Sequence, residues 1–188
     1  RGWVAYWHSD YPAALEHFQR ALYLNEELGD RSGVAAATGN IGNVYGVTSN
    51  YPAALTTLST LCRLTPKQPE VWHLLAEVQR RAGNLTASEK ALNKALELRP
   101  RFTAALNQLA QLQRNAGRLD EASANYRKAL DIEPGNLQAL HDLGLVLKSI
   151  GHWEEAEQVL RKAAGLAPDN PNVQQNFGSV LRLTGRTE

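Results

Sequence analysis

The stretch that decides the fold runs from Asn136 to Pro168 and reads NLQALHDLGLVLKSIGHWEEAEQVLRKAAGLAP. Apolar residues recur at three- and four-residue intervals on both sides of Gly151, which predicts two short amphipathic helices joined by a turn. The same pattern returns when the frame is moved back by 34 residues, and it returns again after a second such step. A fixed period of this length is typical of repeat proteins.

Four prolines fix the frame of the repeat. Pro66, Pro100, Pro134 and Pro168 are 34 residues apart. With each proline at position 32, complete repeats run over 35–68, 69–102, 103–136 and 137–170. A partial long repeat over 1–34 precedes them, and a partial repeat over 171–188 follows. This pattern predicts a single array over residues 1–188 with about eleven antiparallel helices.

The residue classes that recur have packing reasons. Small residues return at positions 8, 20 and 27, as at Gly144, Ala156 and Ala163, where closely packed helices leave no room for a larger side chain. Glycine returns where the first helix of a pair must end, at Gly83, Gly117, Gly151 and Gly185. Glycine adopts the left-handed conformation of a helix end at little cost, and proline ends the second helix because it cannot continue the hydrogen-bond ladder.

These positions resemble the tetratricopeptide repeat (TPR) family. The family pattern has a large residue at position 4, where Trp72 and Leu140 stand, and an aromatic residue at position 24, where Tyr126 stands. It also has a large residue before a small one at positions 7 and 8, alanine at positions 20 and 27, and proline at position 32. The resemblance covers essentially the whole chain and implies an all-α fold, an α-α superhelix built as a TPR solenoid.

The N-terminal part departs from the 34-residue frame. Asp10-Tyr-Pro-Ala-Ala-Leu15 recurs as Asn50-Tyr-Pro-Ala-Ala-Leu55, 40 residues later. This spacing resembles the longer TPR variant of kinesin light chain and cell-polarity adaptors, which implies a second helix extended by about a turn and a half. Pro12 and Pro52 are expected in the first turn of a helix, where the missing N–H has no effect on the helical hydrogen bonds.

Composition excludes several classes of protein. The formal net charge of +1 is too small to indicate nucleic-acid binding, and no apolar run reaches the roughly 18 residues of a membrane span. One cysteine, Cys62, allows no internal disulfide and no multi-cysteine metal site. The chain lacks methionine, and its start has no signal-peptide pattern, so we interpret it as part of a longer protein and expect a cytoplasmic location.

No catalytic constellation is visible in the sequence. It contains no Gly-rich phosphate loop, no His-Glu-x-x-His motif and no nucleophile elbow, so we predict a protein that is not an enzyme and that needs no cofactor or metal. Carboxylates such as Glu121, Glu154 and Glu157 fall on second helices and are expected on a solvated face. Cys62 is expected to be a packing or surface thiol.

The inner face of the first helices remains for function. In a helical-pair solenoid these helices line the concave surface, and positions 2, 5, 9 and 12 share one helical face. We predict a binding surface there. Its candidate residues, taken mainly from positions 5, 9 and 12, are Asn40, Asn43, His73, Glu77, Arg80, Asn107, Gln111, Arg114, His141, Lys148, Gln175 and Arg182.

Position 12 carries a cation in four successive repeats: Arg80, Arg114, Lys148 and Arg182. One interpretation is an exposed position, since exposed positions favour Lys and Arg. The other is a row of cations that, beside amides, binds an extended or helical partner segment of acidic or amide-rich character. Charge reversal at Arg114, alone or with Lys148, is then expected to weaken binding without changing helicity. The two-carboxylate clamp of co-chaperone TPR domains is absent, because Gly39 and Leu74 stand where it needs polar side chains.

Other functions remain open at this stage. The array is alternatively the regulatory or substrate-docking region of a larger enzyme, such as a glycosyl- or sulfotransferase, and its open ends allow self-association. Trp72 and Trp153 are expected in the core because aromatic residues at helical spacing usually pack. Trp3, Tyr6 and Trp7 form either an aromatic binding patch or an apolar surface left uncovered.

Overall fold

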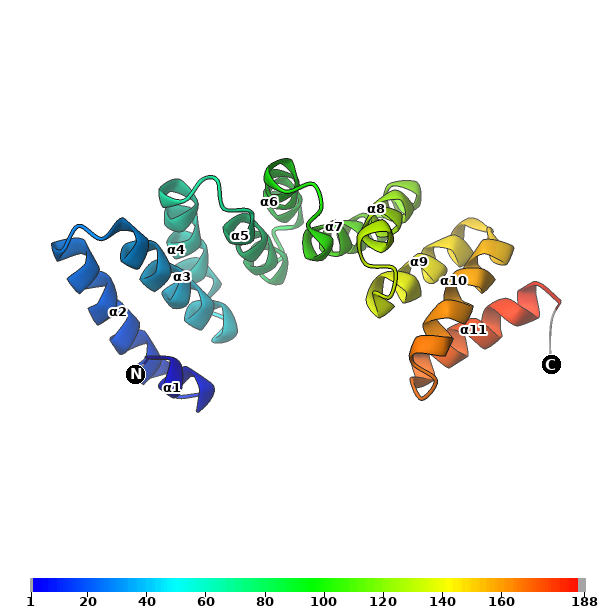
Figure 1. Ribbon diagram of the computed structural model, residues 1–188, viewed down its shortest axis with the longest axis horizontal. Coiled ribbons are helices and arrows are strands. Elements are labelled where there is room, and N and C mark those ends of the chain that lie inside the picture. The colour runs from blue at the N-terminus through cyan, green and yellow to red at the C-terminus, as the bar shows by residue number, and fades with distance from the viewer. Residues whose placement is uncertain (1, 186–188) are drawn as a thin grey trace. The chain divides into compact units, whose positions relative to one another are not determined.

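The computed structural model describes residues 2–185, and these form eleven α-helices without a β-strand (Figure 1). This confirms the predicted all-α class and the number of helices. The chain forms two compact units, Arg1–Leu98 and Arg99–Glu188. Arg1 and residues 186–188 of the predicted array lie outside the described residues. The single continuous array stays a prediction.

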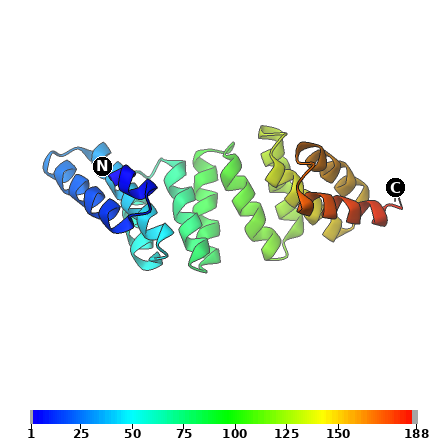
Figure 2. The ribbon, with the colours of Figure 1, turned by 90° about the horizontal axis from the view of Figure 1, so that it is seen from below.

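The first unit contains six helices. They are α1 (Gly2–Trp7), α2 (Tyr11–Glu27), α3 (Arg31–Val47), α4 (Tyr51–Leu64), α5 (Pro69–Arg81) and α6 (Leu85–Leu98). Each helix packs against the next one along the chain, and successive helices run in opposite directions (Figures 1 and 2). The described part of this unit is therefore a row of helical hairpins.

The second unit contains five helices. They are α7 (Thr103–Asn115), α8 (Leu119–Ile132), α9 (Leu137–Ile150), α10 (Trp153–Leu166) and α11 (Pro171–Leu183). Neighbours in sequence pack pairwise, and α9 also contacts both α7 and α11. The first helices of three consecutive repeats therefore lie next to one another in this unit, which is the arrangement that the candidate surface requires.

Small residues allow this close packing, as predicted. A Cβ atom added to Gly144 on α9 would lie 2.4 Å from Cγ of Leu160 on α10, and one added to Gly42 would lie 2.8 Å from a methyl carbon of Leu58. Ala122 and Ala156 are fully buried at position 20. Ser88 takes the same position, and its hydroxyl donates to the carbonyl oxygen of Ala76 at 2.7 Å.

The predicted helix ends are confirmed. Gly151 ends α9 in the left-handed conformation, with φ of 86°, and its N–H donates to backbone carbonyls of the last turn. The other three predicted glycines also have positive φ. Ser49 takes the corresponding place after α3 with φ of 58°, although it carries a side chain. Pro12 and Pro52 lie in the first turns of α2 and α4.

The longer N-terminal repeat differs from the expectation. Both α2 and α3 have 17 residues, whereas α4 has 14 and α5 has 13. The extra length is therefore shared by α2 and α3. The break between them comes from Gly29, which has φ of 66° and follows the end of α2 at residue 27. Asp30 then caps α3 by accepting the N–H of Ser32 at 3.0 Å. The likeness to kinesin light chain repeats stays a prediction.

Two further expectations are wrong. Trp153 is 41% exposed rather than buried, because it is the first residue of α10 and lies at the end of the helical hairpin. Glu157 is buried rather than solvated, and it accepts a hydrogen bond from Arg161 one turn later. Trp72 is half-buried and its indole N–H donates to the carbonyl oxygen of Pro66 at 3.0 Å.

Candidate functional site

A hollow of about 530 Å³ opens in the second unit between α7, α9 and the start of α11. Its apolar lining residues are Leu137, Leu145 and Val173, and the other lining residues are polar. Leu140, Leu143 and Leu147 occupy the buried face of α9. Gln138, His141 and Asp142 are the polar residues of α9 that line the hollow.

Two asparagines fix the helix starts that border the hollow. Asn136 caps α9 by accepting the N–H of Ala139 at 3.0 Å. Asn170 caps α11 by accepting the N–H groups of Asn172 and Val173 at 3.1 and 3.3 Å. Asn is among the preferred N-cap residues, so the local sequence explains both helix starts. The Nδ2 group of Asn170 is left to donate to another molecule.

Asp142 lies at the centre of the polar contacts of the hollow. Its carboxylate side chain is 5% exposed. Oδ1 accepts from Nη1 of Arg114 at 3.2 Å, and Oδ2 accepts from Nε2 of Gln138 at 2.5 Å and from the hydroxyl of Tyr126 at 3.4 Å. Burial, with the nearby charge of Asp142, raises the pKa of Tyr126 well above its usual value, so this phenol stays a donor.

His141 links α9 to α11. Its Nδ1 lies 3.6 Å from Oδ1 of Asp142, and its Nε2 lies 2.9 Å from Nδ2 of Asn176. The same Nδ2 group donates to the carbonyl oxygen of Asn172 at 2.9 Å. Because an amide nitrogen only donates, Nε2 accepts and the ring proton is placed on Nδ1, toward the carboxylate.

The hollow unites three of the predicted site residues of the second unit: Gln111, Arg114 and His141. The other four do not line it. Nδ2 of Asn107 donates to Oδ1 of Asn136 at 3.4 Å, and Nζ of Lys148 donates to the hydroxyl of Ser179 at 3.3 Å. Gln175 and Arg182 are exposed on α11.

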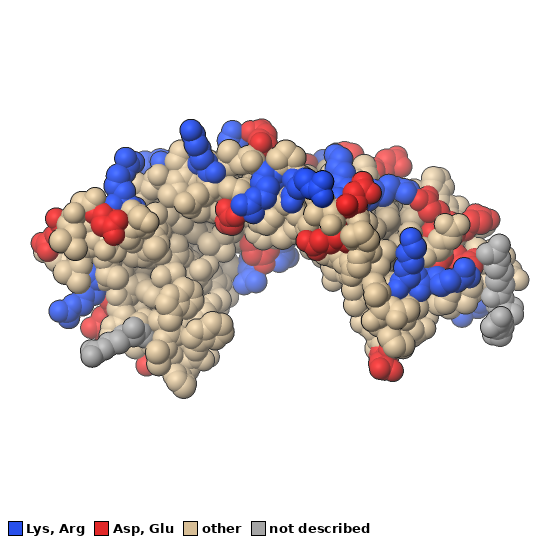
Figure 3. Space-filling view, viewed as in Figure 1, with Lys and Arg blue, Asp and Glu red and all other residues tan. Residues whose placement is uncertain are grey.

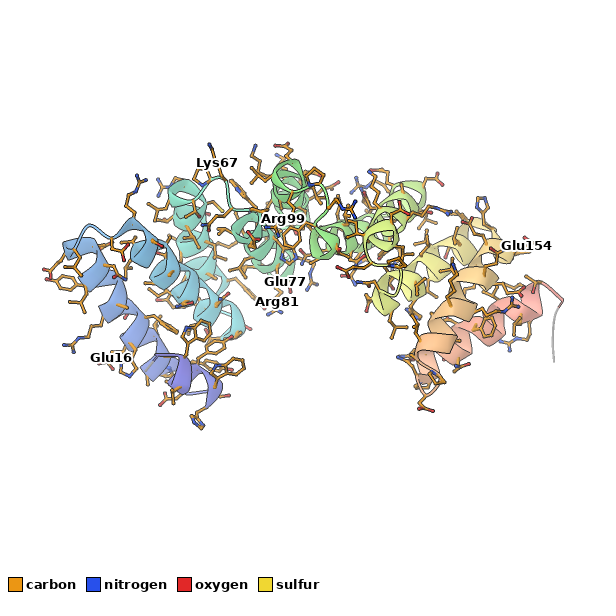
Figure 4. All side chains as sticks on the ribbon, in the orientation of Figure 1. Glu16, Lys67, Glu77, Arg81, Arg99 and Glu154 are labelled. Carbon is orange, nitrogen blue, oxygen red and sulfur yellow. The ribbon has the colours of Figure 1, made fainter. Side chains whose placement is uncertain are left out.

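The predicted residues of the first unit separate into two groups. Asn40 and Asn43 line another hollow of about 530 Å³ bordered by α3, α4 and α5. His73, Glu77 and Arg80 lie on α5 and do not line it. Glu77 accepts two hydrogen bonds from Arg80, at 2.8 and 3.0 Å, and one from Arg81 at 2.7 Å; Figure 4 labels Glu77 and Arg81.

The pKa values of two side chains on α5 are shifted. Burial by itself raises the pKa of Glu77, but the hydrogen bonds and charges of Arg80 and Arg81 together outweigh it, so the pKa lies below its ordinary value. Burial lowers the pKa of His73, and the charge of Glu77 opposes this shift in part. Both groups therefore depend on the folded arrangement of this helix.

Three cations of the position-12 row have partners within the protein. Arg80 contacts Glu77, Arg114 contacts Asp142 and Lys148 contacts Ser179. Arg182 forms no side-chain hydrogen bond or ion pair with another residue between 2 and 185. On the face shown in Figure 3, acidic and basic side chains are interspersed, and the region of α3 and α4 carries few charges.

A different hollow of about 810 Å³ lies in the first unit between α4 and α5, where Leu55, Cys62 and Trp72 are among its lining residues. The hydroxyls of Thr56 and Thr60, also in its wall, donate to backbone carbonyls of α4 at 3.0 and 3.1 Å. Burial raises the pKa of the Cys62 thiol to about 11. This hollow brings together none of the predicted site residues.

Two family models, both described as Tetratricopeptide repeat, match residues 116–175 and 69–112. Together these ranges cover more than half of the chain. The protein belongs to the tetratricopeptide repeat family. No curated protein matches its sequence.

Solved structures share the TPR solenoid fold. MamA aligns with a TM-score of 0.78 and 20% identity over 89% of this chain and 94% of MamA. YrrB, a TPR protein with an unusual peptide-binding site, aligns with a TM-score of 0.73 and 24% identity over 93% of this chain and 87% of YrrB. A TPR protein from Parabacteroides merdae ATCC 43184 aligns with a TM-score of 0.81 and 16% identity over 98% of this chain and 71% of that protein.

Four polar residues that line the hollow of the second unit were missing from the predicted site: Gln138, Asp142, Asn170 and Asn172. Asn170 and Asn172 flank the start of α11, and Gln138 and Asp142 take positions 2 and 6 of their repeat. Position 2 belongs to the inner face by spacing alone, so Gln138 could have been predicted from the alignment of the repeats. Asp142 was not, because its role comes from contacts with another repeat.

The described residues contain no helix that is long and apolar enough to cross a membrane. Within the same range, no cluster of three or more His, Cys, Asp and Glu side chains has the arrangement of a metal site.

Proposed function

We propose that this TPR protein is a non-enzymatic scaffold for protein–protein interaction, and that the hollow of the second unit binds an extended segment of a partner. The observation that carries the proposal is the mixture of donors and acceptors around the hollow. A peptide backbone presents both N–H and C=O groups, so a surface that binds it needs both kinds of partner.

The hollow offers both. Nε2 of Gln138 is used by Asp142, which leaves the Oε1 atom of Gln138 as an acceptor. The Oδ1 atom of Asn170 is used by two backbone groups, which leaves its Nδ2 as a donor. The side-chain amides of Gln111 and Asn172 form no hydrogen bond with another described residue, so each offers a donor and an acceptor.

Arg114 and Lys148 add hydrogen-bond donors that can bind side chains of the partner. Arg114 uses Nη1 for Asp142, and the rest of its five N–H donors are not used by another described residue. Lys148 is held by Ser179 at 3.3 Å and lies on the same helix as His141. An acidic or amide-rich segment over α7, α9 and α11 would find donors at both places. The fold shared with YrrB, which has a peptide-binding site, supports the proposal.

Paired variants test it. Peptides are first selected against the wild-type protein from a displayed random library, and their affinities are then measured by calorimetry. Gln111→Ala and Asn172→Ala are expected to weaken the selected peptides about threefold to tenfold each, since each removes one or two hydrogen bonds. The matched control is Gln158→Ala, an exposed glutamine on α10. Equal affinities in all three variants would reject the hollow as the binding site.

A further inference from the structure

The charge balance of the hollow singles out one residue. Arg114 and Asp142 are the charged side chains among its lining residues, apart from the titratable imidazole of His141. They form an ion pair with 3.2 Å between Nη1 and Oδ1. The carboxylate side chain is 5% exposed and the guanidinium side chain 26%, so the positive partner is the one that solvent or a ligand can reach.

Asp142 also contacts three other side chains. Gln138 and Tyr126 donate to its Oδ2, and the Nδ1 side of His141 faces its Oδ1. Two of the contacts of Asp142, those with Gln138 and Arg114, use one polar group of the side chain and leave an outward one. The Tyr126 side chain is fully buried, and Nε2 of His141 is used by Asn176. For Gln138 the outward group is a carbonyl oxygen, and for Arg114 it is the remaining N–H donors. Asp142 is therefore placed to fix which groups the hollow presents.

We infer that Asp142 is the positioning residue that sets the ligand preference of the hollow, and that it makes the hollow select neutral, amide-rich peptide segments over acidic ones. The inference rests on the proposed function. Arg114 would by itself attract a carboxylate, but a buried counter-charge already occupies one of its faces and offsets part of its attraction for a second carboxylate. An acidic segment would meet the exposed side of a neutral pair, whereas an amide-rich segment finds oriented donors and acceptors.

Two blocked heptapeptides serve as probes: acetyl-Gly-Asn-Gln-Gly-Asn-Gln-Gly-amide and its counterpart with Asp and Glu in place of Asn and Gln. Binding is followed by amide chemical shifts of the ¹⁵N-labelled protein. The wild type is expected to bind the amide probe about fivefold more tightly than the acidic one. Asp142→Asn should raise the affinity for the acidic probe about tenfold, because it frees the charge of Arg114.

Two controls separate this effect from bulk charge. Asp131→Asn makes the same change of charge at an exposed residue of α8 and should leave both affinities unchanged. Arg114→Gln combined with Asp142→Asn removes the cation as well, so the gain for the acidic probe should disappear. An acidic-probe affinity that stays the same in Asp142→Asn, or that rises equally in Asp131→Asn, overturns the inference.

A measurement on the wild type avoids variants that fail to fold. If Asp142 offsets the charge of Arg114 in the wild type, salt has little net charge to screen. The affinity for the acidic probe should then change less than about twofold between about 0.02 M and 0.3 M salt. A steep loss of affinity with salt contradicts the inference. Absence of any shift around the hollow with both probes, in every variant, overturns the proposed function itself and the inference with it.

Discussion

Arg114 on α7 and Asp142 on α9 pair across two repeats, with 3.2 Å between Nη1 and Oδ1 and only 5% of the Asp142 side chain exposed. This contact changes how the row of cations at position 12 is understood. Arg114 is part of the packing between first helices as well as a candidate binding residue. Its reversal to Glu would place a second carboxylate beside Asp142, so we no longer expect that variant to leave the folded state unchanged.

The first prediction concerns the stability that Arg114 contributes. Arg114→Ala leaves the buried carboxylate without its counter-charge, so the free energy of unfolding should fall by about 3 kcal/mol. Arg127→Ala is the matched control, because Arg127 contacts Glu155 in an exposed pair and should contribute less than about 1 kcal/mol. Urea unfolding followed by circular dichroism measures both, and equal losses in the two variants would show that the Asp142 pair is not special.

The second prediction concerns the turn after α3. Ser49 has φ of 58° where the 34-residue repeats have glycine. Ser49→Gly should stabilise the protein by about 1 kcal/mol, because the left-handed conformation is unfavourable for a residue with a Cβ atom. Ser59→Gly, at an exposed site within α4, should instead destabilise it by about 0.5 kcal/mol or more. Thermal unfolding decides the signs, and a lower melting temperature for Ser49→Gly contradicts the prediction.

The third prediction concerns the close contact of α9 and α10. Gly144→Ala places a Cβ atom 2.4 Å from Cγ of Leu160, which is fully buried. The resulting shift should lower the free energy of unfolding by about 1–3 kcal/mol, despite the better helix propensity of alanine. Gly165→Ala on α10 meets no atom within 4 Å and should be neutral or stabilising. A stabilised Gly144→Ala variant would show that the interface has room that the structure lacks.

The fourth prediction concerns pH. Burial lowers the pKa of His73 from its ordinary 6.5, so the unfolded chain binds a proton more readily than the folded one. The part of the stability that is linked to His73 is therefore fully present above pH 6.5. It is lost as the pH drops from there toward the lowered pKa of the folded state. His73→Gln should make urea unfolding less sensitive to pH in this window. An identical pH dependence in the wild type and the variant would contradict the assignment.

Repetition explains how much of the fold was visible in the sequence. Gly144, Ala156 and Gly151 recur with the period because each occupies a place where geometry admits few residue types, so helices and turns were predictable. Glu157 was placed wrongly because periodicity alone does not reveal its buried contact with Arg161. The lengthening of both α2 and α3 was also not predicted, because it depends on the break at Gly29 between them.

The candidate site was predicted only in part for a related reason. Spacing identifies the face of a helix on which Gln111, Arg114 and His141 lie, and the structure brings these three residues to one hollow. Spacing does not identify partners in another repeat. The contact between Arg114 and Asp142, 28 residues apart, depends on side-chain conformations that no pattern of residue types encodes.

Chemical-shift mapping of the ¹⁵N-labelled protein with a library-selected peptide tests the central claim most directly. We expect the shifts to concentrate on Gln111, Gln138 and Asn172, and to weaken in parallel with affinity in Gln111→Ala. Shifts concentrated instead around Trp72, in the hollow between α4 and α5, or on the outer face of α10, would contradict the assignment of the binding site to the second unit.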